Sequence, residues 1–217
     1  MTRIKICCIS SLAEAHLAVQ YGASALGLVS AMPSGPGIIS ERLIAEIAAA
    51  APPAIATFLL TSLQSAREII DQQRRLGANT IQICDCLTTG SYDELRDELP
   101  GIKLVQVIHV GGESSIADAQ RVGPHVDAIL LDSGNQQLAI KELGGTGRRH
   151  DWQISRRIRE AIPLPLFLAG GLNAANVREA IETVRPYGVD VCSGVRTAGG
   201  LDPEKLAAFV AAVRDAG

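Results

Sequence analysis

The chain has 217 residues, and its 20 Lys and Arg residues against 23 Asp and Glu residues give a formal net charge of −3. Its 47% hydrophobic and 20% charged residues are typical of a globular protein and exclude a disordered or collagen-like chain. The mild acidity excludes a broadly basic surface, so we expect neither nucleic acid nor a membrane as partner.

Cellular context is predicted from the N-terminal residues and the cysteines. The apolar run of residues 1–7 is too short for a signal peptide, and no stretch approaches the roughly 18 apolar residues of a membrane-spanning helix. The 5 cysteines are odd in number and form no C-x-x-C pair, which disfavours a disulfide framework. We therefore expect a cytoplasmic protein, either a monomer or a homodimer.

Short apolar runs alternate with amphipathic stretches along the whole sequence. Runs this short and rich in Val, Ile and Leu are typical of strands buried on both faces. In chain order, the predicted strands are 5–9, 25–30, 55–60, 80–84, 104–110, 128–132, 164–169 and 189–193. The predicted helices between and after them are 11–21, 41–51, 62–76, 92–99, 115–122, 154–162, 174–184 and 203–216. Ser11 and Ser40 are predicted N-caps, and Gly22, Gly77 and Gly188 are predicted left-handed C-caps.

This alternation predicts parallel strand pairing with right-handed crossovers. Eight such units close naturally into a (β/α)8 TIM barrel, and a doubly wound open sheet is the alternative. No linker or change of composition divides the chain, so we expect one domain over residues 1–217. In a TIM barrel the functional side chains lie at the C-terminal ends of the strands.

Two glycine-bearing turns follow the last two predicted strands. Gly170 and Gly171 follow one strand, and Ser193 and Gly194 end the other. Glycines allow backbone N–H groups to approach an anion, and TIM barrels often bind phosphate at these two turns. The pattern predicts a small phosphorylated substrate, although glycines that merely form tight turns would look the same. The long stretch after residue 132 has the length of a lid.

Cys7 and Asp132 are the acid–base candidates, near the end of the first and at the end of the sixth predicted strand. A carboxyl group at the end of a buried strand can act as a general acid. A thiol needs help to ionise, which Lys5 on the same strand face or a backbone dipole could give. The alternatives are a small buried cysteine and a loop-capping aspartate.

Several motifs together resemble one enzyme family. They are Lys5-Ile6-Cys7, Leu130-Leu131-Asp132-Ser133, Gly144-Gly145-Thr146-Gly147 with Asp151-Trp152, Leu168-Ala169-Gly170-Gly171-Leu172-Asn173, and Gly188-Val189-Asp190-Val191 with Ser193-Gly194-Val195. In this order, and over almost the whole chain, they resemble the phosphoribosylanthranilate isomerases of tryptophan biosynthesis, which are (β/α)8 barrels. The combination is specific, whereas no single motif is.

The resemblance implies an Amadori rearrangement of N-(5′-phosphoribosyl)anthranilate without a cofactor or metal. It implies that Asp132 is the general acid that protonates the ribose ring oxygen, and that Cys7 is the general base that takes the C2′ proton. It also implies that the substrate and its phosphate are bound by Gly145, Thr146, Gly170, Gly171, Asp190, Ser193 and Gly194.

The sequence departs from the family where the anthranilate would bind. Gly37 stands where the family has the arginine that holds the anthranilate carboxylate, and Cys84 stands where the family has histidine. Glycine cannot replace a bidentate contact between arginine and a carboxylate. The missing cation could come from elsewhere in the chain, and the candidates are Arg148, Arg149 and Arg196.

Two other functions are compatible with the same residues. A paralogous isomerase or binding protein could act on a different phosphorylated sugar amine, because the phosphate and proton-transfer motifs persist without the arginine. A less favoured alternative is a metal-binding barrel that holds Zn²⁺ or Cu⁺ through Cys7, Cys84 and Cys192, with Cys8, Cys86 and His109 close to them.

Overall fold

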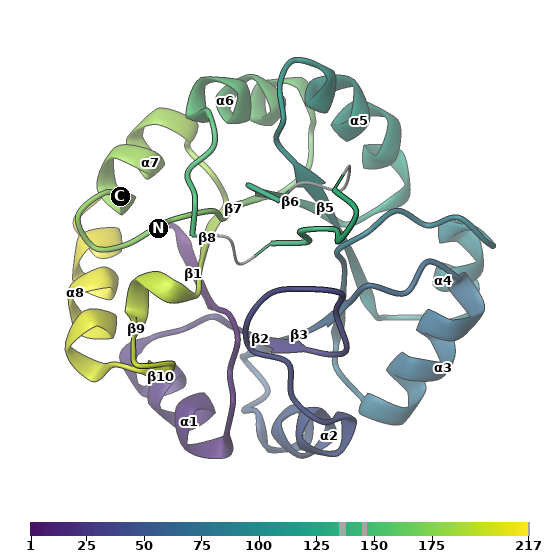
Figure 1. The fold of residues 1–217 in the computed structure, drawn as a ribbon, viewed down its shortest axis with the longest axis horizontal. Coiled ribbons are helices and arrows are strands. Elements are labelled where there is room, and N and C mark those ends of the chain that lie inside the picture. Colours follow the sequence, from purple (N-terminus) through teal and green to yellow (C-terminus); the bar gives the residue numbers. More distant parts are fainter. Residues whose placement is uncertain (135–137, 145–146, 217) are drawn as a thin grey trace.

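The computed structural model describes residues 1–134, 138–144 and 147–216. Within these residues, eight parallel strands close into a barrel and α-helices surround it (Figure 1). The strands are β1 (Arg3–Ile6), β2 (Ala25–Val29), β3 (Ala56–Thr61), β4 (Thr80–Ile83), β5 (Lys103–His109), β6 (Ala128–Asp132), β7 (Leu166–Leu168) and β8 (Gly188–Val191). The barrel closes where β8 pairs with β1, which confirms the predicted TIM barrel.

The helices pack around the strands in chain order. They are α1 (Leu12–Tyr21), α2 (Glu41–Ala50), α3 (Ala66–Leu76), α4 (Tyr92–Glu98), α5 (Ser114–Val122), α6 (Trp152–Ala161), α7 (Val177–Val184) and α8 (Pro203–Arg214). The short elements are η1 (Gly123–His125), η2 (Ser193–Val195) and the antiparallel pair β9 (Arg196–Thr197) and β10 (Gly200–Leu201). Across the described residues, no helix is long and apolar enough to span a lipid bilayer.

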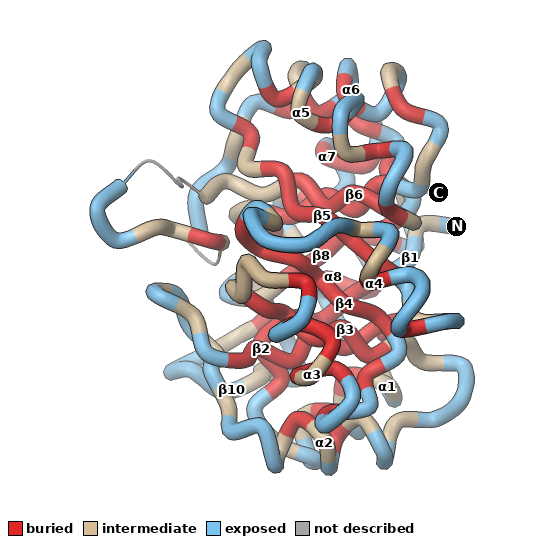
Figure 2. The backbone as a smooth tube through the Cα atoms, turned by 90° about the vertical axis from the view of Figure 1, so that its right-hand side faces the viewer, coloured by how far each residue is buried: buried red, intermediate tan, exposed pale blue. Residues whose placement is uncertain are grey.

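Two apolar clusters form the core, one between strands and helices and one inside the barrel. Figure 2 shows the buried strands running through the middle of the molecule between exposed outer segments. Inside the barrel, Phe58 and Phe167 meet edge to face with ring centroids 5.7 Å apart. Apolar side chains thus fill the barrel below the strand ends.

The predicted helix caps are confirmed with one exception. Ser11 and Ser40 accept hydrogen bonds from the first turns of α1 and α2, and Gly22 and Gly77 are left-handed at the ends of α1 and α3. The prediction for Gly188 is wrong, because Arg185 is the left-handed residue after α7. Gly188 instead lies in β8, where a Cβ atom would be only 2.7 Å from the ring of Phe167.

Two strands end two or three residues earlier than predicted, and this places functional residues in loops. β1 ends at Ile6 because Cys8 adopts a left-handed conformation with a φ of 60°. β8 ends at Val191, so Cys192 and Ser193 also lie beyond the sheet. The backbone N–H of Cys7 still donates a 2.8 Å hydrogen bond to the carbonyl of Val191, so the segments that follow β1 and β8 lie side by side.

Described residues 138–144 of the connection from β6 to α6 lie over the strand ends (Figure 1). Ser34 Oγ, in the loop after β2, donates a 2.6 Å hydrogen bond to the carbonyl of Lys141. The Lys141 ammonium in turn contacts Asp85 Oδ2 at 2.6 Å, just after β4. The long connection is therefore tied to two other loops at the C-terminal end of the barrel.

Candidate active site

A hollow of about 690 Å³, open to solvent, lies at the C-terminal ends of the strands and is called the mouth here. The predicted site residues that line it are Cys7, Asp132, Gly170, Gly171, Asp190 and Ser193. Gly194 lies directly behind this lining. Gly145 and Thr146 lie outside the described residues.

Cys7 and Asp132 face the mouth from different walls. Cys7 follows β1 and is 7% exposed, whereas Asp132 ends β6, which is separated from β1 by β7 and β8. The Asp132 Oδ1 atom accepts a 2.7 Å hydrogen bond from the backbone N–H of Ser133, which orients the carboxylate. A proton donor and a proton acceptor can therefore act on one bound molecule.

A buried ion pair lies beneath Cys7. Lys5 Nζ is 2.8 Å from Asp190 Oδ2, and the two side chains are 0% and 7% exposed. Burial alone would lower the pKa of Lys5, but the Asp190 carboxylate outweighs burial and raises it, so Lys5 stays cationic. A Cβ atom on Gly27 would lie 2.8 Å from Cys7 Sγ and 3.1 Å from Lys5 Nζ. The ammonium and the thiol therefore lie beside the same glycine, where no side chain fits.

The two glycine turns pack directly against each other. Gly170 and Gly171 are left-handed, with φ values of 84° and 65°. A Cβ atom on Gly194 would overlap the carbonyl oxygen of Leu172 and lie 3.0 Å from the Cα atom of Asn173. The absence of a side chain at Gly194 therefore allows the backbone after β8 to approach the backbone after β7, as a phosphate cradle requires.

Gly194→Ala is expected to raise KM for a phosphorylated substrate at least about tenfold, because the methyl group must push the two turns apart. Gly200→Ala is the matched control, since the nearest atom to its Cβ would be 3.8 Å away. The measurement is KM for both variants together with the Kd of a phosphorylated product analogue. Equal values in the two variants would contradict the assignment of the turns to phosphate.

Cys8 and Gly37 exclude each other's side chains. The Cys8 thiol donates to the carbonyl of Pro36 at 3.7 Å. A Cβ atom on Gly37 would lie 2.8 Å from Cys8 Sγ and 3.0 Å from its Cα atom, and the φ of Gly37 is 83°. With the Cys8 side chain in this place, position 37 therefore has no room for a side chain.

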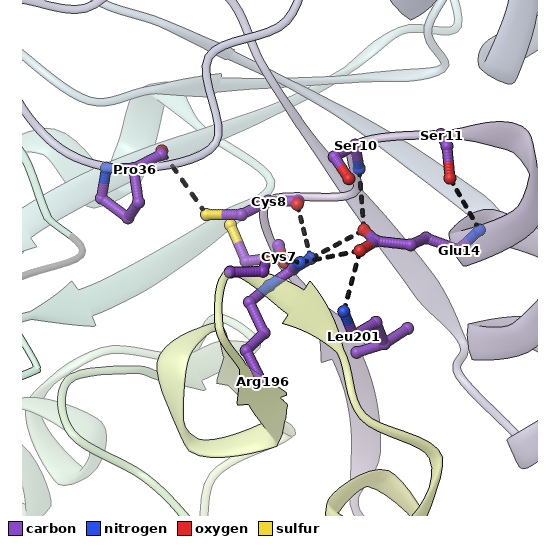
Figure 3. A network of polar contacts seen from close by, with 9 residues as sticks. Cys7, Cys8, Ser10, Ser11, Glu14, Pro36, Arg196 and Leu201 are labelled. Carbon is purple, nitrogen blue, oxygen red and sulfur yellow. Dashed lines mark hydrogen bonds and ion pairs between the residues drawn. The ribbon is translucent and has the colours of Figure 1, made fainter.

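Arg196 is bound within the protein by several polar contacts (Figure 3). It is not among the residues that line the described part of the mouth. Its guanidinium contacts both carboxylate oxygens of Glu14, at 2.9 and 3.0 Å, and donates to the carbonyls of Cys8 at 2.5 Å and Cys7 at 3.3 Å. The Arg196 side chain is 9% exposed. This corrects the prediction of Arg196 as a carboxylate anchor: it fixes the turn that carries Cys7.

The other two predicted anchors also have partners in the protein. Arg148 pairs with Glu142. Arg149 lies over the ring of Trp152, with its guanidinium carbon 3.9 Å from the centroid, and is 3.8 Å from Glu179. Neither arginine is part of the described lining of the mouth, so the structure gives no support to either as the missing cation.

Glu14→Gln is expected to lower the free energy of unfolding at pH 7 by about 2 kcal/mol, because Glu14 accepts several charge-assisted hydrogen bonds. Burial raises the pKa of Glu14, but the Arg196 hydrogen bonds outweigh burial and lower it below 4.5. Its stabilisation is therefore complete above pH 4.5 and is lost as pH falls through the lower, folded-state pKa. The measurement is urea unfolding at pH 7 and pH 3. The free energies of unfolding of variant and wild type should differ less at pH 3 than at pH 7.

The control is Glu46→Gln, which removes an i,i+4 pair whose carboxylate is 45% exposed. It should change stability by less than about 0.5 kcal/mol. If Glu14→Gln lowers the free energy of unfolding by the same amount at both pH values, the contact between Glu14 and Arg196 does not stabilise the fold as an ion pair.

Two further residues lie near the mouth, and their surroundings depend on contacts that the sequence does not show. Lys141 is placed there by its contacts with Ser34 and Asp85, which are distant in the chain. His150 Nε2 is 2.8 Å from Ser155 Oγ, and a Cβ atom on Gly170 would be 3.0 Å from His150 Nδ1. Burial lowers the pKa of His150, so its imidazole is neutral at pH 7.

Three thiols lie together at one side of the mouth, those of Cys7, Cys8 and Cys192. The neighbouring thiols of Cys192 and Cys7, together with burial, raise the pKa of Cys8, so this thiol stays protonated. Cys84 lies apart from them, directly after β4, and His109 Nε2 contacts its carbonyl oxygen at 2.9 Å.

Throughout the described part of the chain, no three His, Cys, Asp or Glu side chains are placed to share a metal ion. The alternative of a metal-binding barrel therefore has no ligand set there.

Comparison with known proteins gives one family. Residues 4–212 match the model of the N-(5′-phosphoribosyl)anthranilate (PRA) isomerase family. An N-(5′-phosphoribosyl)anthranilate isomerase of Haloferax volcanii is 38% identical over 218 residues, covering 100% of this chain and 95% of its own. The crystal structure of the Thermotoga maritima phosphoribosyl anthranilate isomerase has a TM-score of 0.82 and 29% identity, covering 99% of this chain and 100% of that one.

A further solved structure contains a ligand. It is a phosphoribosyl anthranilate isomerase in complex with reduced 1-(o-carboxyphenylamino)-1-deoxyribulose 5-phosphate, with a TM-score of 0.80 and 27% identity over 99% of this chain and 100% of that one. Sequence and fold agree over the full length, and the chain belongs to the N-(5′-phosphoribosyl)anthranilate isomerase family.

Proposed function

We propose that this protein isomerises N-(5′-phosphoribosyl)anthranilate to 1-(o-carboxyphenylamino)-1-deoxyribulose 5-phosphate. The observation that carries the proposal is the arrangement of Cys7, Asp132 and the two glycine turns around one mouth. Family membership and the likeness to a structure with a bound product analogue support it. The substrate is a small phosphorylated molecule, and the proposed setting is the cytoplasm.

The proposed reaction uses two proton transfers with the protein before the enolamine tautomerises, and it needs no external oxidant or reductant. Asp132 gives a proton to the ribose ring oxygen as the C1′–O bond breaks, which leaves a protonated imine at C1′. Cys7, as thiolate, takes the proton from C2′, and the electron pair moves to give an enolamine. Tautomerisation of the enolamine then yields the ketone. An acid and a base on separate walls allow both steps in one bound orientation.

The phosphate turns set the orientation of the sugar. With the 5′-phosphate against Gly171 and Ser193, the ribose would lie between Asp132 and Cys7, which line the same mouth. Asp190 also lines the mouth, and its Oδ1 atom has no hydrogen-bond partner among the described residues. This oxygen is therefore available to accept a hydrogen bond from a ribose hydroxyl group.

The test is a fluorescence assay that follows consumption of freshly made phosphoribosylanthranilate. The purified protein should consume the substrate well above the rate of its spontaneous decay, and inorganic phosphate should inhibit competitively at the glycine turns. Folded protein that neither consumes the substrate nor binds the reduced product analogue would contradict the proposed function.

A further inference from the structure

The charged side chains that line the described part of the mouth are both acidic. They are Asp132 and Asp190. The nearby cations are engaged with carboxylates of the protein: Lys5 pairs with Asp190 below the mouth, Arg196 with Glu14 behind it, and Lys141 with Asp85 at its rim. A negatively charged group on the substrate, away from the phosphate turns, would thus meet carboxylates rather than a free ammonium or guanidinium among these residues.

The wall opposite the phosphate turns is mainly apolar. With the phosphate against the turns after β7 and β8, the aglycone points toward the ends of β2 and β3 and the loop after β6. The lining there includes the polar side chains of Ser34 and Gln82, which already donate to the Lys141 carbonyl and to Cys84 Sγ. Its apolar side chains are Val29, Met32, Leu60 and Leu143. Such side chains favour an aromatic ring, and they offer nothing that compensates the desolvation of a carboxylate.

Cys8 and Gly37 keep this end of the mouth uncharged. Cys8 lines the mouth, whereas Gly37 lies behind it, and any side chain on Gly37 would run into the Cys8 thiol. The thiol donates to the Pro36 carbonyl, and it stays protonated because the neighbouring thiols of Cys192 and Cys7 and its burial raise its pKa. Arg196 holds the Cys8 carbonyl at 2.5 Å and so maintains the left-handed backbone that aims the thiol there.

We propose that Cys8 and Gly37 are specificity-determining residues that make the aglycone site neutral, so that the enzyme accepts phosphoribosyl arylamines without a carboxylate as readily as phosphoribosylanthranilate. The inference rests on the proposed isomerase function and names its substrate class. The aglycone is recognised as an aryl ring, and the phosphate supplies the anionic contact.

The deciding experiment compares two substrates on the wild-type protein. These are phosphoribosylanthranilate and N-(5′-phosphoribosyl)aniline, which lacks only the carboxylate. The expected kcat/KM values lie within about tenfold of each other or favour the aniline compound. A charge-assisted contact to the carboxylate would instead favour phosphoribosylanthranilate by about 10- to 150-fold. A preference for phosphoribosylanthranilate above tenfold would overturn the proposal.

A binding measurement separates this inference from the proposed function. Calorimetry with the reduced carboxyphenylamino-deoxyribulose phosphate and with its phenylamino counterpart needs no turnover. If neither substrate is consumed, the proposed function fails, but similar Kd values for the two ligands still support a neutral site. A Kd more than tenfold lower for the carboxylated ligand overturns it, and loss of that difference in Lys141→Met would identify the cation.

A gain-of-charge variant gives the opposite expectation. Met32→Lys places an ammonium on the apolar wall, and it should shift the preference toward phosphoribosylanthranilate at least about tenfold relative to Met32→Leu. If the ratio is unchanged by the added charge, the aglycone does not lie against this wall and the proposal is wrong.

Discussion

Cys7→Ala and Asp132→Asn should each lower kcat for phosphoribosylanthranilate by at least about 100-fold, because each removes one of the two proton-transfer groups. KM should change much less, since the phosphate turns and the apolar wall are untouched. The substrate-consumption assay measures both parameters. The residual activities of the two variants should be of similar magnitude, since turnover requires both steps in sequence.

The controls for this pair are Cys86→Ser and Asp93→Asn, which alter an exposed thiol and an exposed carboxylate. Both should retain kcat within about twofold, as surface substitutions usually do. Near wild-type turnover in Cys7→Ala would assign the C2′ proton to another base, and His150 would be examined next because its imidazole is neutral and close to Gly170.

Lys5→Met should destabilise the fold by about 3–5 kcal/mol, because it leaves the buried Asp190 carboxylate without its partner. The Lys5 side chain is 0% exposed and the Asp190 side chain only 7%, so solvent compensates the unpaired carboxylate poorly. Asp190→Asn in the same protein removes the orphaned charge, and the double variant should regain most of the loss. Urea unfolding of the two single variants and the double variant measures the coupling.

The matched comparison is Lys103→Met, which removes a contact of 3.4 Å to Asp127 from an ammonium that is 64% exposed. Its effect should stay below about 1 kcal/mol. Additive losses in Lys5→Met and Asp190→Asn would show that the two charges do not stabilise each other.

The barrel is predictable from sequence because its signals are local. Alternating apolar runs and amphipathic stretches define strands and helices, and Ser11 and Gly22 define the ends of a helix within a few residues of themselves. The same holds for the candidate site: Asp132 ends its strand, and Gly170 and Gly171 form a turn whose conformation only glycine adopts easily.

The remaining features depend on contacts between distant residues. No local pattern pairs Arg196 with Glu14, so Arg196 is indistinguishable in sequence from a free arginine near the substrate. The exclusion between Cys8 and Gly37 likewise appears only when the β1 and β2 loops are brought together. The prediction for Gly188 fails for the same reason, since its neighbour is the Phe167 ring on the adjacent strand and not the end of α7.

The contacts that complete the surroundings of Cys7 join the two ends of the sequence. Lys5 and Asp190 are 185 positions apart, and Glu14 and Arg196 are 182 apart. Closing such long loops costs conformational entropy and slows folding. During synthesis the base therefore emerges first and acquires its environment last, when β8 docks on the open edge of β1. A circularly permuted chain in which β8 precedes β1 would make these contacts local and should close its barrel sooner.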